Sequence, residues 1–178
     1  MNEVKLKDKN FEIFINEKEI NDIISNISNR INESGIINPL FIAILNGSFL
    51  FAADLMRKIN IPDAEISFLK LASYDGLSTT GNVNKLIGLS KKIEGRNVIV
   101  LEDIIDTGIT LEKIILSLRK EKINSLKIAT LLYKPNSYQK EYRIDYIGKS
   151  IENDFVVGYG LDYNEKGRNL KNIYKLKN

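Results

Sequence analysis

Two uninterrupted apolar runs, each followed by a segment with helical periodicity, constrain the fold of this chain more than any other feature. Residues 40–45 read Leu-Phe-Ile-Ala-Ile-Leu, and residues 98–101 read Val-Ile-Val-Leu, in a strand expected to begin at Asn97. Strands without polar alternation are typically buried on both faces, as in parallel sheets that carry helices on each side. The pattern therefore predicts an α/β domain with a mainly parallel, twisted sheet flanked by helices.

The remaining segments fit the same alternation of strands and helices. Phe11, Ile13 and Ile15 alternate with polar residues, which predicts a half-buried strand. Asn16 and Glu19 have the spacing of a capping box and predict the start of a helix. The apolar stripe of that helix comprises Ile20, Ile23, Ile24, Ile27 and Ile31. Further strands are expected at residues 66–71, 126–133, 144–147 and 155–157, and further helices at residues 49–59 and 110–120.

Composition narrows the chemistry, because the 178 residues include no histidine and no cysteine. These absences exclude an imidazole base, a thiolate nucleophile, a zinc finger, an iron–sulfur cluster and a disulfide framework. Catalysis would rest on carboxylates, lysine, arginine, hydroxyls and backbone amides. A bound metal would be a hard cation held by oxygen, with Mg²⁺ the first candidate.

Charge and hydropathy indicate neither a nucleic-acid partner nor a membrane. The 26 basic and 23 acidic residues give a net charge of +3, which is too small to argue for nucleic-acid binding. The longest apolar stretch, residues 39–56, is interrupted by Asn46, Gly47 and Ser48 and is too broken to span a bilayer. The charged start of the chain has no apolar run behind it, as a signal peptide would need. We expect a soluble, cytoplasmic protein.

The segment from Val98 to Thr110 carries the chemistry. Its strand ends in Glu102 and Asp103, a third carboxylate follows at Asp106, and a Thr-Gly turn leads into a helix. Sites in parallel sheets lie beyond the carboxyl ends of the strands, where the strand delivers these carboxylates. A turn that opens a helix presents backbone N–H groups to a phosphate. The segment therefore predicts a phosphate site beside carboxylates, with Mg²⁺ or a ligand hydroxyl between them.

Taken one at a time, the residues of this segment are more commonly helix caps or solvated strand ends. Such roles do not account for three acids, a Thr-Gly-x-Thr turn and an apolar strand in one segment. A Walker-B strand would need an upstream G-x-x-x-x-G-K-[ST] loop, and the chain has none. The chain also lacks a G-x-G-x-x-G fingerprint, so a dinucleotide cofactor is not expected.

The segment Leu101-Glu-Asp-Ile-Ile-Asp-Thr-Gly108 resembles the phosphoribosyl-pyrophosphate-binding signature of the type I phosphoribosyltransferases, in particular their hypoxanthine-guanine branch. Further similar segments are residues 42–49, 131–135 and 154–165, and the match extends from about Asn38 to Leu170. The resemblance implies a single phosphoribosyltransferase domain over residues 1–178. Its core would cover about residues 36–150, with a small hood from residues 1–15 and 151–178.

The resemblance also implies the reaction. A 5-phosphoribosyl group would pass from phosphoribosyl pyrophosphate to N9 of hypoxanthine, and of guanine, giving IMP or GMP and pyrophosphate with the help of Mg²⁺. The protein would be a homo-oligomer, either a dimer or a tetramer. A regulator of the same fold that binds RNA, and the xanthine-preferring branch of the same enzymes, are the alternatives.

On the phosphoribosyl side, the resemblance assigns ribose binding to Glu102 and Asp103. The 5′-phosphate would be bound by Asp106, Thr107, Gly108, Ile109 and Thr110. Pyrophosphate would be bound by Asn46, Gly47 and Arg168, and the metal by Glu102, Asp103 and Asp162. Members of the family often have a non-proline cis peptide in the loop around Asn46. Many carry lysine at that position, so the loop here would bind mainly through backbone amides.

On the purine side, the resemblance assigns the general base to Asp106, near N7. The purine would be bound by Lys134, Phe155, Val156 and Asp162, with Lys134 donating to the 6-oxo group. For Lys134 and Phe155 taken alone, an exposed lysine and a core strand residue are the simpler interpretations. Residues 73–81, with Ser73 and Tyr74 the most functional part, would form a lid over the reaction centre.

Overall fold

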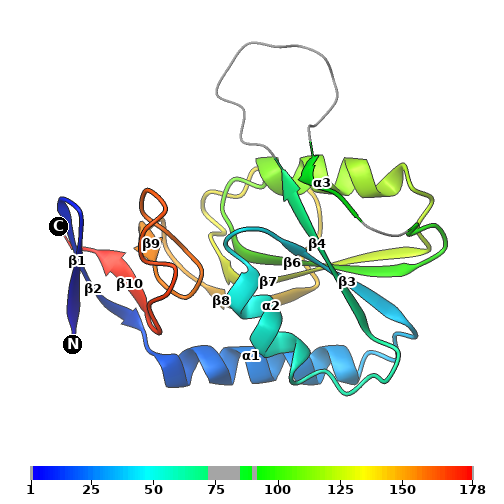
Figure 1. Ribbon diagram of the computed structural model, residues 1–178, viewed down its shortest axis with the longest axis horizontal. Helices are drawn as coiled ribbons and strands as arrows, with labels where there is room; N and C mark the ends of the chain where they lie inside the picture. Colours follow the sequence, from blue (N-terminus) through cyan, green and yellow to red (C-terminus); the bar gives the residue numbers. More distant parts are fainter. Residues whose placement is uncertain (1, 72–84, 90–91, 178) are drawn as a thin grey trace, which may run out of the picture.

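The computed structural model describes residues 2–71, 85–89 and 92–177, and the predicted lid with Ser73 and Tyr74 lies outside them. The described chain forms two sheets of different size, joined by the long helix α1, Glu17–Asn32 (Figure 1). Among the described residues, none of the helices combines the length and hydrophobicity that crossing a membrane requires.

The larger sheet has six strands in the order β5-β4-β3-β6-β7-β8. The five strands β4, β3, β6, β7 and β8 pair in parallel, and only β5 runs antiparallel to its neighbour. This arrangement confirms the predicted mainly parallel sheet. The strands are β3 Pro39–Ile44, β4 Glu65–Leu71, β5 Lys85–Ile87, β6 Asn97–Ile105, β7 Ser125–Tyr133 and β8 Tyr146–Ser150.

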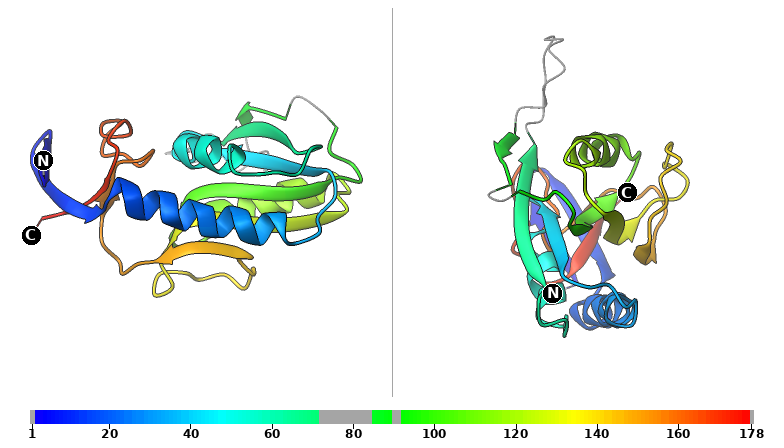
Figure 2. Two further views of the ribbon diagram at one scale, coloured as in Figure 1. Left: turned by 90° about the horizontal axis from the view of Figure 1, so that it is seen from below. Right: turned by 90° about the vertical axis from the view of Figure 1, so that its right-hand side faces the viewer.

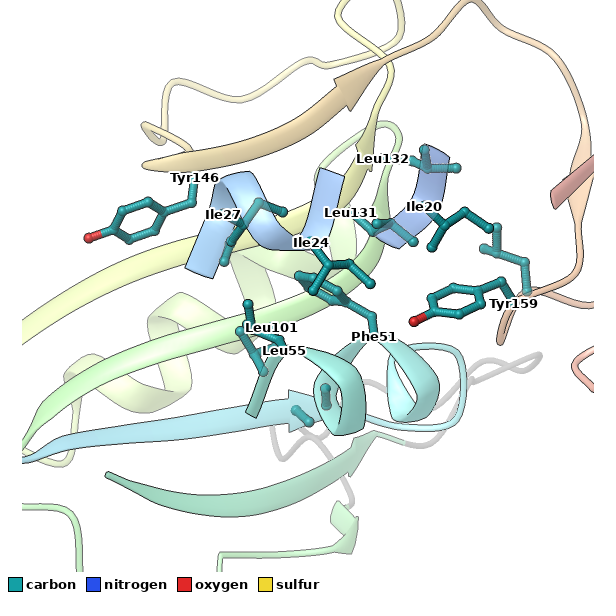
Figure 3. Close-up of a cluster of buried hydrophobic side chains, with 14 of the residues drawn as sticks. Ile20, Ile24, Ile27, Phe51, Leu55, Leu101, Leu131, Leu132, Tyr146 and Tyr159 are labelled. Atoms are coloured by element: carbon teal, nitrogen blue, oxygen red, sulfur yellow. The ribbon is translucent and has the colours of Figure 1, made fainter. Parts of the chain in front are cut away.

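Helices cover both faces of this sheet. Helices α1 and α2, Phe49–Met56, lie on one face, and α3, Ile109–Arg119, lies on the other (Figure 2, right). Alternate residues of the central strands point to opposite sides, so Ile99 and Leu101 pack toward α1 and α2 while Val98 and Val100 pack toward α3. Figure 3 shows the isoleucines of α1 meeting Phe51 of α2 over the sheet.

Helix α1 begins where the sequence predicts. The Asn16 side chain accepts a hydrogen bond of 2.9 Å from the backbone N–H of Glu19 and so caps the helix. The Glu19 carboxylate accepts a hydrogen bond of 2.7 Å from Lys149 on β8 instead of returning to the cap. Of the two hydrogen bonds of the predicted capping box, only the one accepted by Asn16 forms. The Glu19 side chain instead links the helix to the sheet.

Three predicted boundaries are wrong. Strand β6 continues to Ile105, because β7 pairs with it as far as Tyr133, so Glu102 and Asp103 lie within the strand. Helix α2 ends at Met56, because the Lys58 N–H bonds to the carbonyl of Leu55 in a tighter turn. Strand β8 occupies Tyr146–Ser150 rather than residues 144–147, in register with the end of β7.

The smaller sheet has the order β1-β2-β10-β9 with antiparallel pairing throughout, and we call it the hood. Its strands are β1 Glu3–Leu6, β2 Lys9–Ile15, β9 Val156–Val157 and β10 Ile173–Leu176. The cluster beneath it is small, with Phe11, Val157 and Tyr174 as its buried members. The sequence patterns predicted β2 and β9 but neither β1 nor β10.

Candidate active site

Two adjacent carboxylates near the carboxyl end of β6 form the floor of the site. Glu102 is only 6% exposed. Burial raises the pKa of Glu102 well above its usual value, and the neighbouring negative charge of Asp103 adds to the shift. Burial also raises the pKa of Asp103 to about 6, although backbone N–H groups and the positive charge of Arg168 oppose the shift. This end of the strand therefore holds two acids that favour a cation or a hydrogen-bond donor.

A hollow of about 270 Å³ opens above these carboxylates. It is lined by the loop after β3 and by residues 102–111, so the predicted phosphate residues, Asp106 to Thr110, all face it. Helix α3 begins at Ile109 directly after Gly108. The first N–H groups of a helix have no acceptor within the helix, and its positive dipole end favours an anion. The hollow is therefore suited to a phosphate group.

The predicted pyrophosphate loop lies between this strand end and the hood. The Leu45–Asn46 peptide bond is cis, and Gly47 lies against the Asp103 carboxylate, where a Cβ atom would overlap the carboxylate oxygens. Gly160 of the hood, with φ of +98°, packs on the Gly47 carbonyl so closely that it has no room for a side chain. Gly47 lines the hollow, whereas the Asn46 side chain does not.

Asp106 and Lys134 form an ion pair at the edge of the hollow. The Lys134 Nζ donates to Asp106 Oδ2 at 2.8 Å, and the lysine is only 8% exposed. Lys134 follows β7, and its backbone N–H bonds to the Ile105 carbonyl at 3.0 Å. Continued pairing of β6 with β7 thus brings the two residues together. The sequence predicted a role for each residue but not their contact.

The hood carries the other predicted purine residues. The Phe155 ring is 45% exposed and lies 6.3 Å from Phe11 and 5.9 Å from Tyr163, measured between ring centroids. Val156 follows it in β9 and is buried. These ring contacts hold Phe155 in place, while nearly half of its surface stays exposed. Phe11 and Tyr163 are supporting residues that the sequence patterns did not single out.

Arg168 and Asp162 form an ion pair in the hood. Arg168 Nη2 lies 2.8 Å from Asp162 Oδ1 and 3.1 Å from Glu165 Oε2. Its Nη1 donates to the Gly160 carbonyl at 2.8 Å, and Asp162 Oδ2 accepts from the Glu165 N–H at 2.7 Å. The guanidinium therefore reaches the backbone that touches the pyrophosphate loop.

The predicted metal ligands do not form a cluster of three acids in the part of the chain that the structure describes. Asp162 Oδ1 pairs with Arg168, but the negative charge of Asp162 still acts on Asp103 and helps to raise its pKa. The two carboxylates follow each other in β6, and the charge of Asp103 raises the pKa of Glu102, so a hard cation near this strand end would offset their mutual repulsion. Mg²⁺ therefore suits the floor of the site.

The sequence patterns did not predict the contacts between residues that are far apart in the chain. Besides the Asp106–Lys134 pair, Tyr159 donates a hydrogen bond of 2.5 Å to Asp54 on α2. The only sequence signal for Tyr159 is its position between Gly158 and Gly160. In the sequence, Asp54 has the pattern of an exposed helix residue, so hydrophobic periodicity could not predict its contact with Tyr159.

Comparison with known proteins gives one consistent result. The family model described as phosphoribosyl transferase domain matches residues 11–164. The hypoxanthine-guanine phosphoribosyltransferase of Staphylococcus epidermidis is 42% identical over 167 residues, which cover 93% of each chain. The crystal structure of the Bacillus anthracis hypoxanthine-guanine phosphoribosyltransferase matches with a TM-score of 0.84 at 37% identity, covering 94% of this chain and 97% of that chain.

The hypoxanthine phosphoribosyltransferase of Staphylococcus aureus gives a TM-score of 0.85 at 38% identity, covering 93% of this chain and 91% of that chain. Sequence and structure thus agree over almost the whole length of both proteins. The predicted fold, a twisted mainly parallel sheet with a small hood from the terminal segments, is the one these proteins share. The chain belongs to the hypoxanthine-guanine phosphoribosyltransferases, within the family of phosphoribosyl transferase domains.

Proposed function

We propose that this protein is a purine-salvage enzyme that transfers 5-phosphoribosyl from phosphoribosyl pyrophosphate to N9 of hypoxanthine and guanine, giving IMP or GMP. The observation that carries the proposal is the convergence of three parts on one hollow. These parts are the Glu102–Asp103 pair, the turn of residues 106–110 and the Asp106–Lys134 ion pair. Together, these three parts would bind the ribose, its 5′-phosphate and the purine base.

On the phosphoribosyl side, the amides from Asp106 to Thr110 would bind the 5′-phosphate, helped by the dipole of α3. Glu102 and Asp103 would accept hydrogen bonds from the ribose hydroxyls and would hold Mg²⁺, with Asp162 as a further ligand. Bound Mg²⁺ supplies charge that stabilises the departing pyrophosphate. The loop of Asn46 and Gly47 and the Arg168 guanidinium would bind the pyrophosphate itself.

On the purine side, Lys134 would donate to the 6-oxo group and Asp106 would accept the proton that the purine loses near N7. As the bond from N9 to the ribose C1′ forms, the bond from C1′ to the pyrophosphate oxygen breaks. Phe155 would stack on the base, while the Val156 backbone and Asp162 would contact its edge. Ser73 and Tyr74, in the lid, stay a prediction from the sequence.

The proposed enzyme is organised as one domain and is expected to form an oligomer. Residues 1–178 would act as a single domain, with the catalytic floor in the core and the stacking platform in the hood. We expect a homodimer or homotetramer with no nucleic-acid partner. The low net charge of +3 supports the last point.

The test is an assay of the purified protein with Mg²⁺ and phosphoribosyl pyrophosphate, offering hypoxanthine, guanine, xanthine or adenine in turn. Hypoxanthine and guanine are expected to give nucleotide. Adenine is not, because its 6-amino group cannot accept a hydrogen bond from Lys134 in the way an oxygen does. Removal of the divalent cation with a chelator is expected to abolish turnover, and re-addition of Mg²⁺ should restore it.

Three outcomes would contradict the proposal. Turnover of xanthine in preference to hypoxanthine would place the chain in the xanthine branch. Salt-dependent RNA binding without turnover of any purine would indicate a regulator. Full activity in the presence of the chelator would refute the metal assignment.

A further inference from the structure

A short segment of the hood, Gly158 to Leu161, contacts both α2 and the loop that precedes it. The Tyr159 hydroxyl donates to Asp54 Oδ2 at 2.5 Å. The Tyr159 ring is 7% exposed and packs in the main core with Ile20 of α1 and Phe51 of α2, as Figure 3 shows. The hood is therefore anchored to α2 by a specific hydrogen bond as well as by apolar packing.

The backbone of Tyr159 indicates that its side chain fixes this segment. Its φ is +49°, in the left-handed region that bulky residues seldom adopt. Contacts on both sides hold this backbone conformation, because the Tyr159 N–H bonds to the Leu170 carbonyl at 2.9 Å while the side chain is fixed by Asp54. The ring and hydroxyl of Tyr159 thus hold the next residue, Gly160, in a defined place.

Gly160 is the point where the hood meets the pyrophosphate loop. Its Cα packs directly on the Gly47 carbonyl, and its own carbonyl accepts from Arg168 Nη1 at 2.8 Å. Its N–H donates to the Arg168 carbonyl at 2.9 Å. A displacement of Gly160 relative to α2 would therefore move Arg168 relative to Gly47, the two groups that we expect to bind the pyrophosphate.

We propose that Asp54 and Tyr159 are positioning residues that set the distance between the pyrophosphate loop and Arg168. Neither residue lines the hollow above Glu102; both line a separate cavity beside α1 and α2, and their hydrogen bond joins α2 to the hood. They act through α2, which begins two residues after Gly47, and through Gly160. The inference rests on the proposed pyrophosphate role of the loop and Arg168.

The test compares substitutions that remove either end of the hydrogen bond. Tyr159→Phe removes the donor and keeps the ring, and Asp54→Ala removes the acceptor. Each is expected to raise the KM for phosphoribosyl pyrophosphate about fivefold to tenfold, with the KM for hypoxanthine changed less than about twofold. The double variant should match the single variants, because both remove the same bond. Asp54→Asn retains an acceptor oxygen and should recover most of the affinity.

The hood offers a matched control. Tyr163 donates a hydrogen bond of 3.0 Å to Asp8, a second Tyr–Asp pair in the hood that does not reach α2. Asp8→Ala is expected to leave the KM for phosphoribosyl pyrophosphate unchanged. An equal effect of Asp8→Ala and Asp54→Ala would overturn the proposal, as would an equal rise of both KM values or strictly additive effects in the double variant.

A direct measurement separates this inference from the proposed function. Calorimetric titration of phosphoribosyl pyrophosphate with Mg²⁺ reports its affinity without turnover. If the wild type forms no nucleotide, the proposed function fails, but weaker binding by Tyr159→Phe would still support the positioning role. If the wild type is active and both variants bind phosphoribosyl pyrophosphate as it does, only the positioning role fails.

Discussion

The six-stranded sheet and the hood are built in opposite ways. In the large sheet all six residues of β3 are buried, and helices cover both faces. In the hood, β1 alternates between exposed and half-buried residues, and its small cluster is flanked by surface ion pairs. Those pairs include Lys177 with Glu3 at 2.7 Å and Lys175 with Glu12 at 3.5 Å. Such exposed pairs contribute little to stability, because water and salt screen them.

This contrast matches the proposed division of labour. The groups proposed for the ribose, the phosphate and proton transfer all follow or belong to strands of the large sheet. The proposed stacking surface for the base sits on the hood, whose buried apolar cluster is smaller. We therefore expect changes in the large sheet to affect global stability and turnover, and changes in the hood to affect mainly the binding of the substrates.

The largest effect is expected from truncating a core aromatic residue. Phe51 and Phe11 are both fully buried, but Phe51 lies in the main core and Phe11 under the hood. Phe51→Ala is expected to lower the free energy of unfolding by about 3–5 kcal/mol. Phe11→Ala should instead loosen the hood locally, with a smaller global loss and faster amide exchange in β1 and β2. Equal global losses in denaturant unfolding would show that the two sheets unfold as one unit.

Asp106→Asn tests the proposed proton transfer at the edge of the hollow. The amide cannot accept the purine proton, so turnover is expected to fall on the order of 100-fold or more. The affinity for phosphoribosyl pyrophosphate should be retained, because the turn of residues 106–110 would bind phosphate through its backbone. Steady-state kinetics and calorimetry check the two halves of the prediction. An unchanged turnover number would remove Asp106 from the role of general base.

Lys134→Met tests whether base selection also depends on the large sheet. Losing a charged hydrogen bond to the 6-oxo group is expected to raise the KM for hypoxanthine about tenfold, without changing the KM for phosphoribosyl pyrophosphate. Lys127 lies on β7, the strand that Lys134 follows, and bonds to the Tyr146 hydroxyl at 3.2 Å. Lys127→Met is therefore the control and should leave both constants unchanged. If Lys134→Met behaves in the same way, purine recognition belongs to the hood alone.

A smaller, pH-dependent effect is expected from Asp103. Its pKa is raised by burial from 3.8 to about 6, so the folded state binds this proton more tightly than the unfolded state. The resulting stabilisation is present at low pH and is lost as the pH rises through about 6. Without divalent cations, the wild type should lose about 2 kcal/mol of unfolding free energy relative to Asp103→Asn between pH 4 and pH 7. A difference in unfolding free energy that stays constant over this range would contradict the burial of a protonated carboxyl.

The sequence predicts those parts of the fold and of the site that are formed by residues close together in the chain. The apolar runs that become β3 and β6 identify the sheet, and the acids at 102, 103 and 106 lie in one site because the strand and turn are continuous. Strands β1 and β10 were not predicted, because their charged alternation becomes informative only once they pair with β2. The same holds for Lys134 with Asp106, which are 28 residues apart.

The contact between Gly47 and Gly160 also limits how this protein can change by mutation. Each position already holds the smallest residue, so neither can shrink to accommodate a side chain on the other. A saturation library should therefore tolerate many residues at Asn46, whose side chain does not line the hollow, and almost only glycine at these two positions. An evolutionary path to a loop of different shape would require a coordinated shift of the two backbones, which single substitutions do not provide.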